Sequence, residues 1–352
     1  MNARPLFMKQ NHPHHSRRSW IRNMALASSA SWLVSCRPEE HSTPAAAGNK
    51  PKADFSNEEY VWISPHANLP LYKAHDHPAL ELAAKELGVK ATITGPSTLD
   101  MGMFVSMIET TIARRPAGML ISAWDPSVVI APIAKAFEAQ VPVVTVDVDA
   151  PGSKRLTFVG TNWFDLGVRQ GEAMVKALAG KRGKIALLGL TEQYIDQQAF
   201  AGFRSVIEKA GLSAMEPQHD KGDSAVAARV ASTIIQSTSE LVGMAGFDSE
   251  SGPGIGLAVK EAGKVGQIVV TCVDAEPVHL NLIKEGVVTA AIGQKRELFT
   301  YLGLRVLFDL NHSPLKFTAN DRKAGVFAAP EVINTGSYTV TRENVDVFLK
   351  PA

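Results

Sequence analysis

Short apolar runs alternate with longer segments that carry an apolar stripe on one face, from residue 60 to residue 310. Runs such as 143–146, Val-Val-Thr-Val, are rich in β-branched residues and are typical of strands buried on both faces of a parallel sheet. Longer segments such as 224–236 carry apolar residues three and four positions apart, which predicts helices. Because the two kinds of segment alternate with short connections, the pattern predicts βαβ units and an α/β fold.

The same pattern predicts the individual elements. The predicted strands are 60–64, 91–94, 119–122, 143–146, 156–159, 184–188, 241–245, 268–273 and 288–292. The predicted helices are 71–87, 100–114, 126–139, 163–178, 199–210, 224–236, 254–262, 278–285 and 297–310, and the tail adds an extended run at 332–338 and a helical turn at 343–348. The elements form two similar sets, and 352 residues leave room for two cores. We therefore predict two Rossmann-like lobes with parallel sheets.

Two of the apolar runs end on an aspartate. Asp147 closes the run 143–146, and Asp274 closes the similar run 269–273. Ligands of open α/β sheets lie just beyond the carboxyl ends of the strands. We therefore expect the two aspartates to face one cleft from two sheets and to hold a polyhydroxylated small molecule. The alternative is that both aspartates only cap the helices that follow them.

Other strand ends carry aromatic, carboxylate and amide side chains. This mixture suits a sugar, because carboxylates and amides form paired hydrogen bonds with vicinal hydroxyls, and aromatic rings stack on the C–H face of the sugar ring. For Trp163 and Phe247, packing in the core is the alternative. The candidate ligand-binding residues are Tyr72, Trp124, Asp147, Asp149, Asn162, Asp196, Gln197, Phe247, Asp274 and Gln294.

The charges are unevenly distributed along the chain. The first 35 residues hold five of the 36 Lys and Arg residues and no Asp or Glu, which leaves 31 basic against 35 acidic residues and a net charge of −4 for the remainder. A mildly acidic protein has no electrostatic reason to bind nucleic acid. No apolar run approaches the ~18–20 residues that a membrane-spanning helix needs.

The N-terminus has the layout of an export signal. Arg17-Arg18, followed by the modestly apolar stretch 24–34, resembles the twin-arginine motif, and 33–36 resembles a bacterial lipobox in which the Cys36 thiol takes the lipid. We therefore predict a signal peptide at 1–35, a flexible tether at 36–57 and a periplasmic protein held at the membrane through its lipid alone. A cytoplasmic protein with a basic N-terminus is the alternative, and export by the general route stays open.

Residues for catalysis or metal binding are not grouped in a recognisable way. The sequence has no Gly-x-Ser-x-Gly elbow and no phosphate loop, and the glycines of 252–256 lack the dinucleotide-binding spacing. His75 and His77 would point to different faces of a helix, which makes a poor chelate. Cys272 lies in a predicted core strand and is expected to be a small buried hydrophobe. We predict no enzyme activity, no cofactor and no metal site.

Several short segments at the strand ends resemble one family. They are 68–72, 121–126, 141–147, 160–167, 269–274 and 290–294. Together they resemble the periplasmic sugar-binding proteins of ABC importers, in particular the ribose-receptor-like group with the type I binding-protein fold. The resemblance implies that Tyr72 stacks on the ligand, that Asp147 and Asp274 bind its hydroxyls from opposite lobes, and that Gln294 adds a hinge amide.

The resemblance also implies a three-strand hinge between the lobes. The crossings are expected near 161–162, 293–295 and 320–322. The N-terminal lobe would then combine 58–160 with 295–321, and the C-terminal lobe would combine 161–294 with 322–352.

The chain departs from the ribose-type pattern at several positions. Val148 stands where an arginine is usual, an arginine expected near Gln197 is absent, and Phe247 aligns with an expected asparagine. The pairs Asp147/Asp149 and Asp196/Gln197 are more similar to rhamnose- and autoinducer-type receptors. The expected ligand is therefore a neutral sugar or polyol, with no pentose specified.

The function expected from these residues is capture of a sugar by closure of two lobes and its delivery to the membrane subunits of an ABC permease. One alternative is a receptor that presents ligand to a sensor kinase or chemoreceptor. A second is a sugar-modifying enzyme that uses Asp147 and Asp274 as an acid–base pair. A transcriptional repressor on this fold would need an N-terminal helix-turn-helix, where an export leader stands instead.

Overall fold

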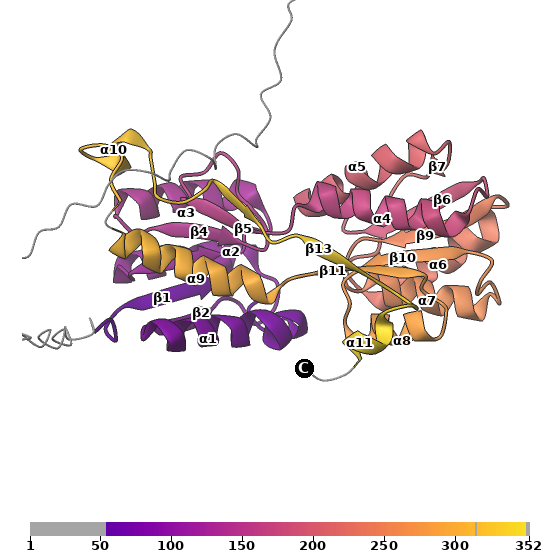
Figure 1. Cartoon of the computed structure of the whole chain (residues 1–352), viewed down its shortest axis with the longest axis horizontal. Coiled ribbons are helices and arrows are strands. Elements are labelled where there is room, and N and C mark those ends of the chain that lie inside the picture. Colours follow the sequence, from indigo (N-terminus) through magenta and orange to yellow (C-terminus); the bar gives the residue numbers. More distant parts are fainter. Residues whose placement is uncertain (1–53, 314, 350–352) are drawn as a thin grey trace, which may run out of the picture. The chain divides into compact units, whose positions relative to one another are not determined.

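Strands and helices alternate along the chain, as the hydrophobic pattern predicts, and the strands form two sheets (Figure 1). The computed structural model describes residues 54–313 and 315–349. The predicted signal peptide, Cys36 and the tether up to residue 53 lie outside the described residues. The described residues belong to one compact unit. Among the helices that the structure describes, none is both long and apolar enough to cross a bilayer.

The first sheet is parallel throughout. Its order is β12-β5-β4-β3-β1-β2, with each adjacent pair in parallel register. Its strands are β1 (Glu59–Ile63), β2 (Lys90–Thr94), β3 (Gly118–Ile121), β4 (Val143–Val146), β5 (Thr157–Gly160) and β12 (Val332–Asn334).

The second sheet is parallel except at one edge. Its order is β13-β11-β10-β9-β6-β7, β8 also pairs with β6, and β13 runs antiparallel to β11. Its strands are β6 (Lys184–Gly189), β7 (Ser213–Ala214), β8 (Gln218–His219), β9 (Leu241–Gly246), β10 (Val269–Val273), β11 (Ala290–Gln294) and β13 (Ser337–Thr341).

Helices cover both faces of the first sheet. The two-residue period of a strand sends alternate side chains to opposite faces. Val61 and Ile63 therefore pack against α2 and α3, whereas Tyr60 and Trp62 pack against α1 and α9. The helices of this half are α1 (His77–Leu87), α2 (Met101–Arg114), α3 (Pro126–Glu138), α9 (Glu297–His312) and the short α10 (Asp321–Ala324).

The second sheet is covered in the same way. Ile185 and Leu187 pack toward α4 and α5, whereas Ala186 and Leu188 pack toward α6 and α7. Cys272 is fully buried in this second group, as expected. The helices of this half are α4 (Trp163–Leu178), α5 (Tyr194–Lys209), α6 (Ser224–Ser237), α7 (Ser251–Glu261), α8 (Pro277–Lys284) and α11 (Val345–Phe348).

The chain passes between the sheets at three places. It leaves β5 for α4 after Gly160, leaves β11 for α9 after Gln294, and passes from β12 to β13 at 335–336. The segments lie side by side, because Gln294 pairs with Ser337 and Thr335 N donates to Gly160 O at 2.9 Å (Figure 1).

The third passage differs from the expected one near 320–322. Residues 315–331 stay with the first sheet, because Arg322 donates from Nη2 to Phe137 O at 2.6 Å and its guanidinium carbon lies 4.3 Å from the Phe137 ring centroid. β12 then still pairs with β5. Sequence pattern alone did not reveal these contacts between distant segments.

The helix predicted at 71–87 begins with a turn of π-helix, η1 (Tyr72–Asp76), before α1 starts at His77. His77 N donates to Tyr72 O, five residues back. Pro78 has no N–H and cannot donate to the carbonyl four residues earlier, which removes one α-helical bond from this turn. The turn buries Tyr72 and Asp76, and both belong to the site described below.

Helices α4 and α5 touch through their backbones. An added Cβ at Gly202 would lie 2.0 Å from Phe164 O, and one at Gly167 would lie 2.0 Å from Ala199 O. The two glycines therefore set the distance between these helices.

We expect Gly202→Ala to destabilise the fold by at least about 2 kcal/mol, because the added methyl forces α4 and α5 apart. Chemical denaturation measures the change. Gly102→Ala is the matched control, since Gly102 is exposed in α2 and the nearest atom to its added Cβ lies at 3.5 Å; helix propensity predicts no loss there. Equal stability of the two variants would contradict the backbone contact.

Candidate functional site

Asp147 and Asp274 occupy equivalent places in the two sheets. Asp147 follows β4 and Asp274 follows β10, and both have a left-handed backbone with φ of 67° and 66°. Each N–H donates to the neighbouring strand, Asp147 to Val159 O at 3.2 Å and Asp274 to Ile292 O at 2.9 Å. Aspartate tolerates this conformation better than most residues, and such backbones gather at functional sites.

A buried arginine connects Asp147 to a second carboxylate. Arg296 is 4% exposed and lies directly before α9, two residues after the end of β11. Its Nη1 donates to Asp147 Oδ1 at 3.1 Å, while Nε and Nη2 donate to the two oxygens of Asp76 at 3.1 and 3.3 Å. The rings of Tyr72 and Phe299 lie against the guanidinium, with centroids 5.2 and 5.1 Å from its carbon. A buried guanidinium needs such partners, because removing a charge from water is costly.

Asp76 is the most deeply buried charged residue of this group. It is completely buried, and burial raises its pKa to about 7, although Arg296 acts in the opposite direction. Thr300 Oγ1 donates to the Asp76 carbonyl at 2.7 Å and fixes the end of η1 against α9. Asp76 therefore fixes the part of the Arg296 guanidinium that does not bond Asp147.

Two aromatic side chains lead from Asp147 to solvent. The Tyr72 hydroxyl donates to Asp147 Oδ2 at 2.6 Å and accepts from Trp124 Nε1 at 2.7 Å. Burial, with the Asp147 charge, raises the pKa of Tyr72 well above its ordinary value, so the hydroxyl stays a donor. Trp124 lies on the wall of a cleft of about 520 Å³.

This cleft has walls from both halves of the fold. Leu99 and Trp124 come from the first half, and Tyr194, Gln197 and Lys221 come from the second. The predicted residues Trp124 and Gln197 therefore face the same space from different sheets.

The second aspartate is paired with an amide. Gln294 Nε2 donates to Asp274 Oδ1 at 2.9 Å. Burial raises the pKa of Asp274, although Arg296 and Gln294 act against the increase. Gln294 Oε1 is buried and has no protein donor among the described residues. An unpaired buried acceptor is costly, so this oxygen suits a ligand hydroxyl.

Residues 60–312 match the periplasmic binding protein domain. The chain belongs to this family. Among solved structures, the sugar-binding protein of a sugar ABC transporter from Bacillus halodurans is 29% identical, with a TM-score of 0.76, and the match covers 83% of this chain and all of that one. The arabinose-binding protein AraP from Geobacillus stearothermophilus is 30% identical, with a TM-score of 0.73, over 84% of this chain and all of that one. The ribose import binding protein of Bacillus subtilis is 25% identical over 80% of this chain and 89% of that one.

This periplasmic binding protein has the predicted fold, with two α/β sheets that match type I binding proteins. Five of the ten predicted site residues form the two hydrogen-bonded groups described above, one around Asp147 and one around Asp274. They are Tyr72, Trp124, Asp147, Asp274 and Gln294.

Asp149 lies apart from this group. Its Oδ1 accepts from Thr145 Oγ1 at 2.8 Å, from Ala150 N at 2.7 Å and from Arg155 Nε, and its Oδ2 accepts from Arg155 Nη2 at 2.6 Å. The carboxylate is occupied by the protein, so in this arrangement Asp149 stabilises the loop after β4. Two aspartates separated by one residue would lie on one face of an extended strand, but the left-handed backbone at Asp147 breaks this alternation.

Two other predicted residues have structural contacts. Asn162 Oδ1 accepts from Asp165 N at 3.1 Å and caps α4. Phe247 is fully buried and packs edge-on against Phe200 and Phe203, with centroids 4.7 and 5.4 Å away. Phe247 is therefore packed in the core, the alternative considered from the sequence, because these two rings of α5 cover it.

Asp196 and Gln197 lie in the first turn of α5, which begins at Tyr194 and not at residue 199 as predicted. Asp196 is buried and accepts from Leu190 N at 3.1 Å, and burial together with Asp248 raises its pKa. Gln197 is exposed in the cleft and donates to Thr191 O at 3.3 Å. Gln193, with an extended backbone, is the N-cap of α5, so the helix begins five residues before the apolar pattern indicated.

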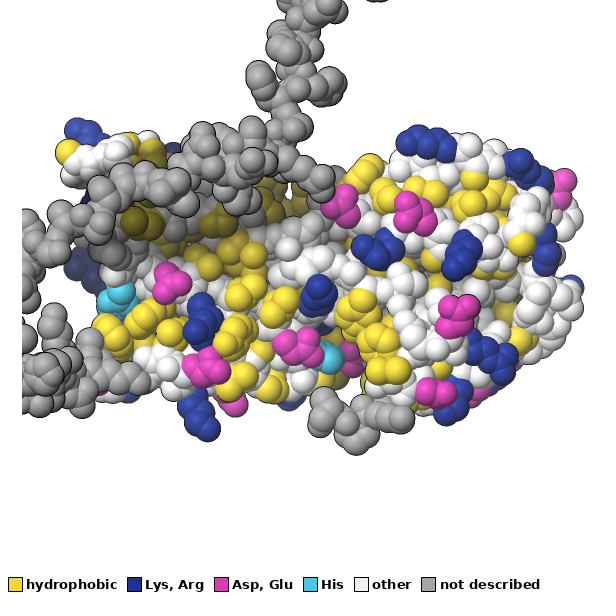
Figure 2. All heavy atoms as spheres, viewed as in Figure 1, with side chains coloured by type: hydrophobic (Ala, Val, Ile, Leu, Met, Phe, Trp, Pro, Cys, Tyr) yellow, Lys and Arg dark blue, Asp and Glu magenta, His cyan; other side chains and the backbone are white. Residues whose placement is uncertain are grey.

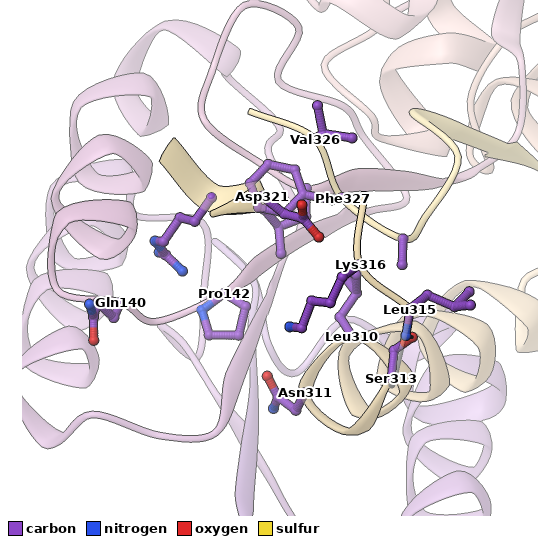
Figure 3. A pocket seen from close by; sticks show the side chains of 13 residues that line it. Gln140, Pro142, Leu310, Asn311, Ser313, Leu315, Lys316, Asp321, Val326 and Phe327 are labelled. Carbon is purple, nitrogen blue, oxygen red and sulfur yellow. The ribbon is translucent and has the colours of Figure 1, made fainter. Parts of the chain in front are cut away.

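A second hollow lies in the first half of the fold, beside residues 315–328 (Figure 3). Two of its polar side chains, Asn311 and Asp321, already have protein partners. Asn311 donates to Tyr60 Oη at 3.0 Å and to Ala117 O at 2.9 Å, and Asp321 accepts from Phe317 N at 3.1 Å. These bonds leave few groups to orient a small molecule there.

Charged side chains of both signs occur on the face of the molecule drawn in Figure 2. On the face drawn in Figure 2, basic and acidic side chains are interspersed and form no continuous basic stripe. An electrostatic footprint for a polyanion would need such a stripe.

Sequence analysis missed Arg296 and Asp76, which hold Asp147 in place. Neither follows an apolar run as an aspartate at a strand end does. The available signal for Arg296 is its position two residues after Gln294, at the passage from β11 to α9. For Asp76, the following Pro78 marks an irregular helix start.

His75 connects the two halves beside this site. Its Nε2 bonds Glu276 Oε1 at 2.9 Å, and its Nδ1 bonds Glu297 Oε1 at 2.7 Å. Glu276 follows β10 of the second sheet, whereas His75 belongs to η1 of the first half. The bonds to Glu276 and Glu297 raise the pKa of His75 to about 10, so the ion pair persists at neutral pH.

We expect His75→Gln to lower the melting temperature more at pH 6 than at pH 10. A raised folded-state pKa gives stability that is complete below the unfolded value of 6.5 and is lost as pH rises through about 10. The lowered pKa values of Glu276 and Glu297 place the acid-side loss below 4.5. Calorimetry at the two pH values measures the difference, and an equal effect at both would contradict a charged His75.

Proposed function

We propose that this periplasmic binding protein captures a neutral sugar or polyol between two lobes and delivers it to an ABC permease. The observation that carries the proposal is the symmetric pair Asp147 and Asp274, one at the end of a strand in each sheet. Family membership supports a transport receptor over an enzyme. The sugar-binding names of relatives such as AraP support the ligand class.

Binding would proceed by closure of the lobes. The first lobe comprises 58–160 and 295–334, and the second comprises 161–294 and 337–349, which adjusts the predicted boundaries to the pairing of β12 with β5. A ligand that contacts Asp147 and Asp274 together favours the arrangement in which both are within reach. The permease then recognises the closed form, and the ligand is released unchanged.

Asn162, Asp196 and Gln197 have secondary roles in this proposal. Gln197 reaches the ligand from the cleft wall, whereas Asn162 and Asp196 hold the ends of α4 and α5 that frame the cleft. Asp149 and Phe247 support the loop and the core behind it.

We expect Asp147→Asn and Asp274→Asn each to weaken sugar binding by about 2 kcal/mol or more. Either change removes a charged acceptor and leaves ligand hydroxyls poorly paired, while asparagine still tolerates the left-handed backbone. A thermal-shift screen over pentoses, hexoses, deoxysugars and polyols first identifies a ligand by its stabilising effect. Calorimetry with that ligand then compares the variants.

Asp165→Asn is the control for these variants. Asp165 is exposed in the first turn of α4. Its affinity should equal that of the wild type. Unchanged affinity in both Asp147→Asn and Asp274→Asn would contradict a binding site formed by the two carboxylates.

We also propose that the protein is exported through residues 1–35 and anchored by a lipid on Cys36. The twin-arginine and lipobox resemblances support this step, and the family has an extracytoplasmic location. A single lipid-bearing terminus attaches a folded receptor without a spanning helix.

Cys36→Ser should move the full-length protein from the membrane fraction to the soluble fraction without changing its sugar affinity, because the substitution removes only the acceptor thiol. Fractionation and immunoblotting measure the distribution. Cys272→Ser serves as the control, since Cys272 is buried in the core and should not affect partitioning. Membrane retention of Cys36→Ser would rule out this anchor.

A further inference from the structure

Arg296 has donors that the protein does not use. A guanidinium carries five N–H groups, and Arg296 makes three hydrogen bonds within the described residues, two to Asp76 and one to Asp147. Two N–H groups therefore remain without a protein acceptor there. The side chain is buried, so these donors need a partner other than bulk water.

Asp147 has complementary acceptors. Each of its oxygens accepts one protein bond, Oδ1 from Arg296 and Oδ2 from Tyr72. A carboxylate offers about four lone-pair sites, so about two remain for a ligand. A donor site and an acceptor site thus lie next to each other, joined by the 3.1 Å bond between Arg296 and Asp147.

We infer that Arg296 is a specificity-determining residue that makes the site require a hydroxyl at this position of the ligand. A hydroxyl donates its proton to Asp147 and accepts an N–H of Arg296 at the same time. This inference rests on the proposed sugar-binding function and adds the chemical feature that is selected.

The pairing discriminates against two close analogues. A deoxy analogue lacks both bonds and leaves Arg296 and Asp147 partly unpaired, which a polar site rejects strongly. An amino analogue carries an ammonium group that donates to Asp147 but cannot accept from Arg296, and the two cations repel. Without Arg296, the carboxylates of Asp147, Asp76 and Asp274 would favour the ammonium group.

The geometry behind Arg296 fixes this selection. Asp76 engages Nε and Nη2 together, which sets the plane of the guanidinium, and the Tyr72 and Phe299 rings pack beside it. A lysine at this position would keep the charge but could not bond both Asp76 and Asp147 as a planar fork does.

The test measures affinity for D-ribose, D-allose and D-galactose, each beside its monodeoxy and monoamino derivatives, by calorimetry. The wild type should bind at least one parent sugar at least about 100-fold more tightly than one of its deoxy and one of its amino derivatives. Arg296→Lys should weaken binding of the parent sugar at least about 10-fold, because one bond of the fork is lost.

The variant Asp76→Asn/Arg296→Met removes the guanidinium without leaving Asp76 as a buried unpaired charge, which protects folding. Relative to Asp76→Asn alone, it should shift the ratio of amino to parent affinity toward the amino sugar by at least about 10-fold. A structural role would weaken all the sugars alike and leave this ratio unchanged.

Arg305→Lys is the matched control, because Arg305 also lies on α9, bonds a carboxylate of Glu86 at 2.7 Å and has a Tyr301 ring at 5.1 Å. It should leave every affinity unchanged. Parent binding with an unchanged ratio in the double variant would overturn the role of Arg296. Failure of the wild type to bind any sugar or polyol of the thermal-shift screen would instead overturn the proposed function, and this inference with it.

Discussion

The site depends on one buried ion pair network, in which the guanidinium of Arg296 lies between Asp76 and Asp147. Burial of a charge is tolerated only when partners of opposite charge and good geometry are present. The π-helical turn brings Asp76 and Tyr72 to this guanidinium, and the passage from β11 to α9 brings Arg296 itself. Segments more than 200 residues apart in sequence are thereby joined at the point where the chain changes sheets.

The two sheets solve the same problem with different partners. Each ends a central strand on an aspartate in the left-handed conformation, and each aspartate is tied by its N–H to the next strand. The first aspartate is then held by an arginine and a tyrosine, whereas the second is held by Gln294. The carboxylates are alike in backbone and unlike in electrostatic surroundings, which gives a ligand two distinct ends to recognise.

The sequence predicted what depends on local pattern. Strands, helices and the two aspartates follow from apolar runs and their ends, so the α/β class and the pairing of Asp147 with Asp274 as strand-end residues could be read directly. Contacts between distant segments could not. Asp149 follows the same strand as Asp147, only two residues later, but its carboxylate is paired with Arg155. Phe247 follows a strand as Trp124 does, yet two rings of α5 cover it. Arg322 keeps 315–331 with the first sheet, so the last crossing lies later in the chain than predicted.

The sheet edges carry a consequence for behaviour at high concentration. β12 is three residues long at one edge of the first sheet, and β7 and β8 are two residues each at an edge of the second. An exposed edge strand is a template for pairing with another chain, and the hazard grows with its length. Strands this short offer a neighbouring copy only two or three residues of backbone to bind. Pairing with a second copy is therefore disfavoured at these two margins, and it is left to the opposite edges, β2 and β13, which are five residues long.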